Sequence, residues 1–171
     1  MSSLVLLDTF SGSFGNDIIV TGIDDSFTHH RVILKQGATG YNNGVNCFVT
    51  KSGAIQTGAN YRYAGLNQYN GGTRLRNNTG GTQAQIWNNN EENNVRSRGM
   101  AIFIADLYNF ADSSSYDYVV MRGQSQTNDI YSYNLPVWTM VYTVASASDG
   151  FAIRKNSSAT MHGELSLYGV K

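Results

Sequence analysis

Short apolar runs, rich in β-branched and aromatic residues, alternate along the chain with clusters of Gly, Asn, Asp and Ser. Their spacing is typical of an all-β sandwich, in which short strands end at turns. No window with helical periodicity is longer than one or two turns. We therefore predict a single domain with an all-β, antiparallel β-sandwich fold. The predicted strands are Leu4–Phe10, Ile18–Gly22, Arg31–Gln36, Val45–Lys51, Tyr61–Gln68, Gln83–Trp87, Gly99–Leu107, Tyr116–Arg122, Val137–Ala145, Phe151–Arg154 and Met161–Tyr168.

The last predicted strand, Met161–Tyr168, has one apolar and one polar face. Leu165 and Leu167 share the apolar face, while His162 and Glu164 lie on the other. This alternation is what a sheet with one face in water requires. We expect Leu165 and Leu167 to be core residues.

Two other predicted strands carry apolar side chains more widely. In Val137–Ala145 one face is apolar and the opposite face is β-branched and semi-polar; the apolar face holds Trp138, Met140, Tyr142 and Val144. In Gly99–Asp106 both faces are apolar: Met100, Ile102 and Ile104 oppose Ala101, Phe103 and Ala105. A strand with two apolar faces must be covered on both sides. The second sheet is one cover, and another subunit is a candidate for the other, with Met100, Ile102, Phe103 and Ile104 as interface residues.

The segment Asn67–Asn94 is dominated by Asn and Gly. It contains Asn70–Gly72, Asn77–Gly81 and Asn88–Asn94 around one short predicted strand. Asn and Gly tolerate the backbone conformations of turns, so we predict long polar loops here. Loops on a rigid scaffold often carry recognition, although loops that only connect strands have the same composition.

An aromatic set lies in or near this segment: Tyr61, Tyr63, Tyr69 and Trp87. Tyr61 and Tyr63 alternate along a predicted strand and therefore share a face. Tyr and Trp combine a large apolar surface with a polar tip, which suits glycan stacking and protein interfaces. These four residues are our candidate binding site for a glycan or a protein; the alternative is that their rings pack the domain's own core.

Charge argues against a nucleic-acid partner. The chain has 171 residues with 12 Lys plus Arg and 12 Asp plus Glu, whereas a nucleic-acid binder normally has a basic excess. Charged residues make up only 14% of the chain, so solubility must come from neutral polar groups. Such a surface has little charge repulsion to oppose self-association. The single cysteine, Cys47, lies in an apolar run and is expected to be a small buried hydrophobe.

No pattern of residues predicts catalysis or a cofactor. The chain lacks a nucleophile elbow, a phosphate-binding loop and a dinucleotide-binding motif. Three histidines and one cysteine at scattered positions do not form a zinc pattern. The carboxylate pairs Asp24–Asp25 and Glu91–Glu92 lie in turns or loops, where we interpret them as solvated residues instead of calcium ligands. We predict no catalytic residue, no metal and no cofactor; a glycan-degrading or metal-dependent enzyme is the alternative.

The N-terminal sequence lacks a basic region, and its apolar stretch is too short for a signal peptide. No segment approaches the roughly 20 apolar residues that span a bilayer. We expect a protein made in a cytoplasm, with no membrane partner, that leaves it only as part of a larger particle.

The order of these features resembles a group of structural proteins from the virions of tailed bacteriophages. The most specific part is the end of the chain: Phe151–Arg154, the Ser/Asn turn Asn156–Ser158, and Gly163–Lys171, with a small-x-hydrophobic-x-Leu-Tyr-Gly pattern. Ile18–Ile23 and Asn60–Ala64 match the same group in order. Longer fibre proteins of this kind carry a shaft before the matching part, whereas only a few residues precede the first strand here.

The resemblance implies a jelly-roll-like sandwich, a homotrimer, and contacts with other virion proteins such as major capsid or tail proteins. It favours a non-enzymatic structural protein on the virion surface, made in the host cytoplasm. Without a shaft, a capsid decoration protein or a small tail or fibre component fits better than a complete fibre. The alternative is a lectin-like receptor-binding module that contacts host surface glycans.

Overall fold

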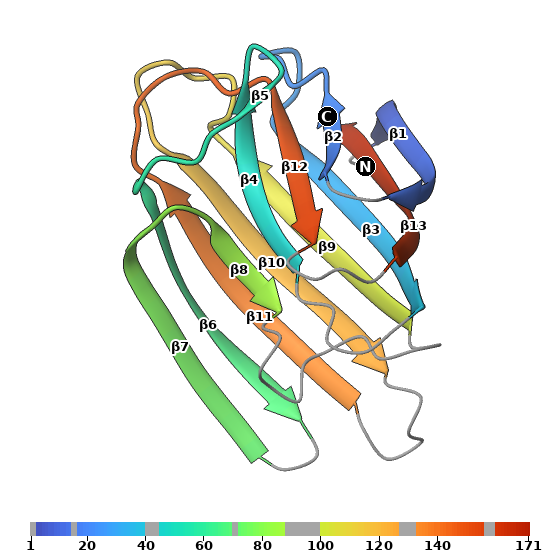
Figure 1. Ribbon diagram of the computed structural model, residues 1–171. Helices are drawn as coiled ribbons and strands as arrows, with labels where there is room; N and C mark the ends of the chain where they lie inside the picture. Colours follow the sequence, from blue (N-terminus) through green and yellow to red (C-terminus); the bar gives the residue numbers. More distant parts are fainter. Residues whose placement is uncertain are drawn as a thin grey trace.

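The computed structural model describes residues 3–14, 17–39, 45–69, 72–87, 100–126, 133–155 and 160–171. The regular structure of these residues is entirely β-strand (Figure 1). The strands are β1 (Leu4–Phe14), β2 (Asp17–Thr21), β3 (His29–Thr39), β4 (Val45–Lys51), β5 (Ala54–Ile55), β6 (Tyr61–Tyr69), β7 (Gly72–Gly81), β8 (Ala84–Trp87), β9 (Met100–Tyr108), β10 (Asp117–Gln126), β11 (Tyr133–Tyr142), β12 (Gly150–Lys155) and β13 (Thr160–Val170).

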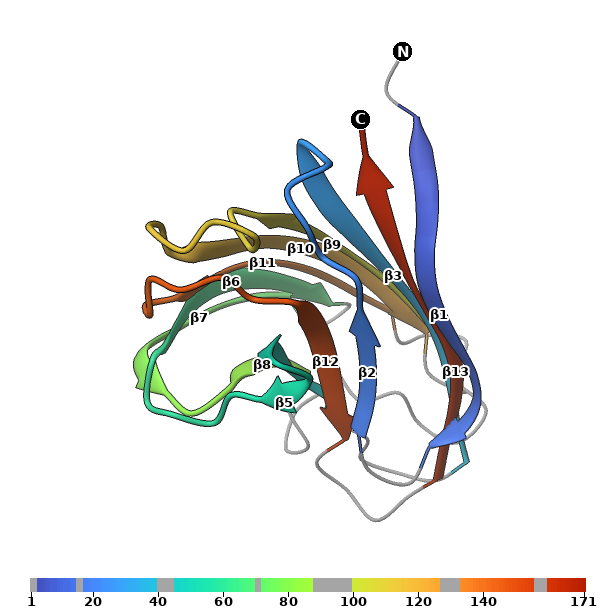
Figure 2. The ribbon, with the colours of Figure 1, turned by 90° about the horizontal axis from the view of Figure 1, so that it is seen from above.

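Two antiparallel sheets form the fold. The larger has the order β1-β13-β3-β9-β10-β11-β6-β7, and the smaller has the order β2-β12-β4-β5, with β8 paired to β4. Figure 2 shows the larger sheet curving around the smaller one, which lies in its concave side. The chain crosses between the sheets repeatedly, for example from β1 to β2 and back to β3. The predicted antiparallel, jelly-roll-like sandwich is confirmed.

The core lies between the sheets, where the alternating faces of their strands meet. Leu165 and Leu167 of β13 are fully buried, which confirms their predicted place in the core. Trp138, Met140 and Tyr142 of β11 are buried as well, and Val137 on the opposite face is exposed. The two-residue period of these strands therefore gave the correct face.

Cys47 of β4 is fully buried among sulfur and aromatic side chains. Its Sγ lies 3.8 Å from the sulfur atoms of both Met121 and Met140. Burial raises the pKa of the Cys47 thiol far above its ordinary value, so the thiol stays protonated. The prediction of a small buried hydrophobe is confirmed.

The prediction of loops throughout Asn67–Asn94 is wrong in one part. The predicted turn Asn77–Gly81 belongs to β7, which pairs with β6 in a register that places Leu75 opposite Leu66. As an edge strand, β7 is held by backbone hydrogen bonds to one neighbour and does not need an alternating apolar face. Because β7 is mostly polar, the sequence pattern did not predict it as a strand. Asn88–Asn94 lies outside the described residues.

The interface prediction for β9 needs a correction. Ala101, Phe103 and Ala105 point into the sandwich and are fully buried, so Phe103 is a core residue and not an interface residue. Ile102, on the opposite face, is 49% exposed, and Ile104 is half-buried. The side chain of Met100 lies outside the described part of the structure. The strand is apolar on both faces, as predicted, but only one face is covered within the described chain.

Candidate contact surface

The outer, convex face of the larger sheet carries a row of apolar side chains across neighbouring strands. Directly opposite residues of an antiparallel pair point to the same side of a sheet. The register therefore aligns one row from β3 to β7: Ile33, Ile104, Arg122, Val137, Leu66 and Leu75. All except Arg122 are apolar. We call this face of β3, β9, β10, β11, β6 and β7 the outer face.

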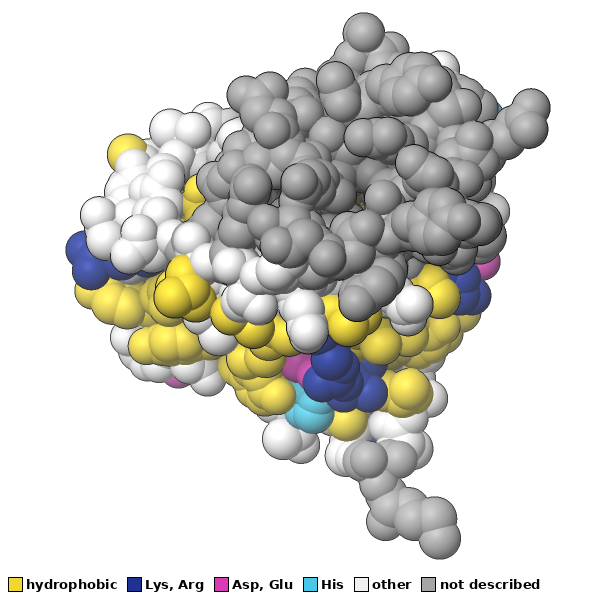
Figure 3. Space-filling model, turned by 90° about the horizontal axis from the view of Figure 1, so that it is seen from below, with side chains coloured by type: hydrophobic (Ala, Val, Ile, Leu, Met, Phe, Trp, Pro, Cys, Tyr) yellow, Lys and Arg dark blue, Asp and Glu magenta, His cyan; other side chains and the backbone are white. Residues whose placement is uncertain are grey.

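Most of the large hydrophobic side chains that are exposed lie on the outer face or its continuation onto β1. Leu75 is 81% exposed and Val137 is 51% exposed. The remaining members on β6, β9, β10 and β11 are Leu66, Ile102, Tyr108, Tyr118, Val120 and Leu135. Figure 3 shows hydrophobic side chains in a band on this side of the molecule. In Figure 2 no described element covers the convex side of the sheet.

Ion pairs interrupt the apolar band and neutralise its buried charge. Asp106 of β9 is buried, and its Oδ1 accepts a hydrogen bond from Arg31 Nε at 2.6 Å. Arg122 lies 3.9 Å from the other carboxylate oxygen. The hydrogen bond to Asp106 raises the pKa of Arg31. A partner that covers this face would therefore not bury an unpaired carboxylate. Burial of an unpaired charge is what costs the most free energy.

A shallow concavity of about 550 Å³ lies at the β11–β6–β7 end of the outer face. Its exposed walls are Leu66, Leu75 and Val137, with Thr139 and Asn77 beside them. The wall is mainly apolar and open, so it suits an apolar side chain of a partner better than an enclosed small molecule.

Tyr61, the first member of the aromatic set predicted from sequence, does not lie on this surface. Tyr61 is fully buried: its hydroxyl accepts a hydrogen bond from Val49 N–H at 3.1 Å and donates one to the Gln56 carbonyl at 2.8 Å. Burial raises the pKa of Tyr61. Tyr61 is therefore a core residue, which corrects its prediction as a binding residue.

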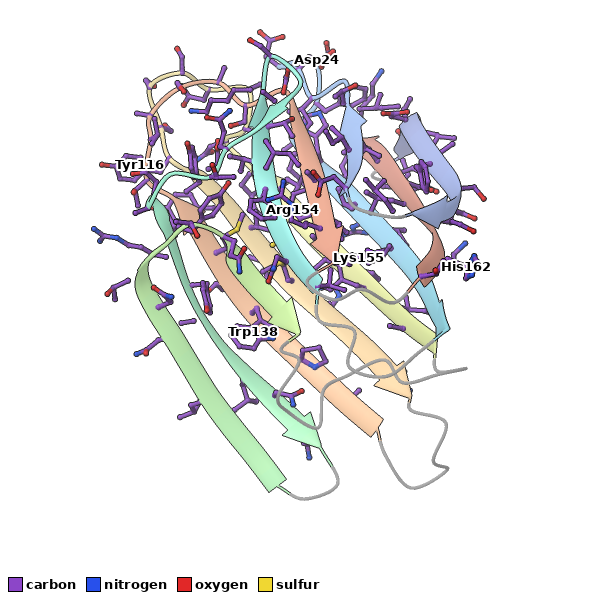
Figure 4. The ribbon with its side chains drawn as sticks, in the orientation of Figure 1. Asp24, Tyr116, Trp138, Arg154, Lys155 and His162 are labelled. Atoms are coloured by element: carbon purple, nitrogen blue, oxygen red, sulfur yellow. The ribbon has the colours of Figure 1, made fainter. Side chains whose placement is uncertain are left out.

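Tyr63, the second described member of the aromatic set, does not lie on the outer face either. Tyr63 is half-buried and packs on the inner face of the sheet, with its ring centroid 5.8 Å from that of Trp138. Figure 4 shows Trp138 on the inner side of the larger sheet. The side chains of Tyr69 and Trp87 lie outside the described residues.

The candidate metal and acid–base residues lie apart. Figure 4 places Asp24 at one end of the sandwich and His162 on β13, well away from it. His162 Nδ1 forms a hydrogen bond of 2.6 Å with Ser13 Oγ. The second carboxylate pair, Glu91–Glu92, lies outside the described residues. Within the described ranges, no group of three or more His, Cys, Asp or Glu side chains is placed to hold a metal ion.

Sequence reasoning missed a buried carboxyl group at the start of β10. Asp117 is fully buried; its Oδ2 accepts a hydrogen bond from Ser148 Oγ at 2.6 Å, while its Oδ1 has no partner. Burial raises the pKa of Asp117 to about 7, against the opposing effects of Ser148 and Lys51. The signal was present in the sequence, because a two-residue period places Asp117 on the same face as Val119 and Met121.

No protein-family model matches this chain, and neither does any curated protein or solved structure with which it was compared. Among the described residues, no helix is long and apolar enough to cross a membrane.

Proposed function

We propose that this protein is a non-enzymatic structural component of a phage particle, and that it acts by contact through its outer face. The exposed apolar row on β9, β10, β11, β6 and β7 carries this proposal. The resemblance of Gly163–Lys171 to phage structural proteins supports the particle as its setting.

The dimensions of the outer face support a protein partner. From β9 to β7 the row crosses four strand spacings, or about 19 Å. Along β11, the outward residues from Leu135 to Val141 span about 20 Å. These dimensions give an area of about 380 Å², which is within the range of the largest apolar patch on a monomeric soluble protein, and such patches are often functional.

The partner that we propose for this face is another copy of the same chain, within a homotrimer. Charged residues of this face and of the adjoining β13 form ion pairs, Arg31 with Asp106 and Lys35 with Glu164, so neither sign of charge dominates. Two copies of such a face can therefore associate without strong charge repulsion. The rest of the trimer surface would contact other virion proteins. A capsid decoration protein is our first choice of role, and a small tail or fibre component is the second.

Light scattering coupled to size exclusion tests this proposal. The expected mass is that of three copies of 18.7 kDa, or about 56 kDa, at micromolar concentration. Val137→Lys, in the middle of the outer face, should give a folded monomer. Ile19→Lys is the matched control, because Ile19 is an exposed β-branched residue on β2 of the other sheet. A monomeric parent protein, or equal effects of both substitutions, would contradict the proposed contact surface.

A further inference from the structure

A second candidate site lies at one end of the sandwich, between loops that adjoin the outer face. A pocket of about 390 Å³ opens between the β2–β3 loop and the β9–β10 loop. This volume is within the range of small-ligand sites. Its apolar floor includes Leu107, Phe110 and Ala111, and its polar wall includes Asp24, Asp25, His29, His30, Asn109 and Asp112.

The wall of this pocket is acidic. Asp24, Asp25 and Asp112 line it, and no Lys or Arg is among the lining residues. Outside the lining, Lys171 Nζ lies 5.7 Å from the centroid of the Phe27 ring. Asp24 keeps acceptor capacity, because its recorded hydrogen bond, from Ser26 N–H, occupies one carboxylate oxygen. Asp112 already accepts hydrogen bonds from Ser114 and Ser115.

An unsatisfied imidazole lines the same pocket. His30 is only 3% exposed, and its Nε2 has no hydrogen-bond partner. Its recorded ring contact is an edge-on packing against Phe27, with centroids 5.6 Å apart. Burial lowers the pKa of His30, so the neutral ring, with one nitrogen free to accept a hydrogen bond, predominates at neutral pH. A buried polar group without a partner is unusual and costly in a native protein.

We infer that this pocket binds an organic cation, an alkylammonium group presented by a basic side chain of a partner or by a small free amine. The carboxylates of Asp24, Asp25 and Asp112 supply negative charge, and the unpartnered Nε2 of His30 can accept a hydrogen bond from an ammonium N–H. A divalent metal fits less well, because the described carboxylates and histidines are not gathered into a metal-sized group. The pocket adjoins the outer face, because His29 in its lining stacks on Tyr108 with ring centroids 5.1 Å apart. Its three carboxylates lie in the loops, so binding there is tested independently of the proposed function.

The test is a titration of the ¹⁵N-labelled protein followed by amide chemical shifts. The probes are N-acetyl-lysine methylamide and n-butylammonium, with N-acetyl-norleucine methylamide and methyl glucoside as neutral controls. We expect shifts confined to residues 24–30 and 107–113, caused by the two ammonium probes only and weakened by added salt. Tighter binding of the lysine derivative assigns the site to a partner's side chain, whereas equal binding assigns it to a small amine.

Two variants separate binding from folding. Asp25→Asn removes an exposed carboxylate and should weaken the ammonium probes roughly threefold to tenfold. Asp17→Asn, at an exposed position on β2 of the smaller sheet, is its control and should leave the affinity for the ammonium probes unchanged. His30→Leu should weaken binding while the denaturation midpoint stays the same or rises, because an unsatisfied buried polar group is removed.

Three results would overturn the inference. The first is the absence of shifts with both ammonium probes at millimolar concentration, and the second is equal or stronger binding of a neutral probe. The third is unchanged ammonium binding in Asp25→Asn and His30→Leu.

Discussion

Substitution of Gly65 by Ala tests the packing of the larger sheet at its tightest point. Gly65 of β6 lies directly opposite Trp138 of β11, and the Trp138 ring rests on the Gly65 backbone. A Cβ at position 65 would lie 2.3 Å from Trp138 Cδ2 and 2.4 Å from Cε3. Real carbon–carbon contacts are near 3.5–4.0 Å, so the ring or the strand must move by about 1 Å or more.

The ring has little freedom to move, because Trp138 is buried and packs against Tyr63. Inserting a methyl group into a packed core costs about 1–3 kcal/mol, and the depth of this overlap places Gly65→Ala at the upper end. For a chain of this length, 3 kcal/mol corresponds to a fall in Tm of roughly 6–12 °C. Urea unfolding followed by far-UV circular dichroism gives the free-energy change directly.

Gly80→Ala is the matched control. Gly80 lies in β7, next to β6, and nothing lies within 4 Å of a Cβ added there. We expect a change within about 0.5 kcal/mol. Trp138→Leu should reduce the cost of Gly65→Ala in a double-mutant cycle, because it removes the ring that the methyl group meets. Equal midpoints for Gly65→Ala and Gly80→Ala, or strict additivity in the cycle, would refute the packing described here.

Three further predictions concern stability and reactivity. Leu165→Ala should cost about 2–5 kcal/mol by denaturant unfolding, whereas Glu164→Ala should change stability by about 0.5 kcal/mol or less; the reverse ranking would mean a register error of one residue. Asp117 has a folded pKa of about 7, above its ordinary 3.8, so its protonated form is favoured in the folded state. The parent should therefore lose stability relative to Asp117→Asn as pH rises from about 4 to about 7, by up to about 4 kcal/mol, and a pH-independent difference would contradict this. Cys47 should not react with a thiol reagent until the protein unfolds, because burial keeps its thiol protonated and inaccessible; rapid labelling of the native protein would be the opposite result.

The positions of the strands were predictable because alternation along a strand is local information. Val45–Lys51 was predicted with the bounds that β4 has, and the buried faces of β11 and β13 followed from the two-residue period. The strand β7 was not predictable in this way. Its pairing with β6 depends on backbone hydrogen bonds at a sheet edge, which leave no apolar pattern in the sequence.

The candidate surfaces depend on contacts between distant parts of the chain. The sequence placed Ile102 and Phe103 on opposite faces of one strand without indicating which face is buried. Only the register across five strands places Ile102 on the same face as Val137 and Leu75. Likewise, the acidic pocket joins two loops about 80 residues apart. Tyr61 shows the converse error, because an aromatic residue suited to recognition is equally suited to a core, and neighbouring residues cannot distinguish the two.

The proposed role requires that this protein be present on a phage particle, where it would act by contact. Quantitative mass spectrometry of gradient-purified particles, from a phage that encodes the chain, tests this role. We predict that the protein is present in multiples of three copies per particle and remains with the capsid when tails are removed. Its presence on capsid-free tails would shift the role to the tail component. Its absence from purified particles would contradict the proposed role on the phage particle.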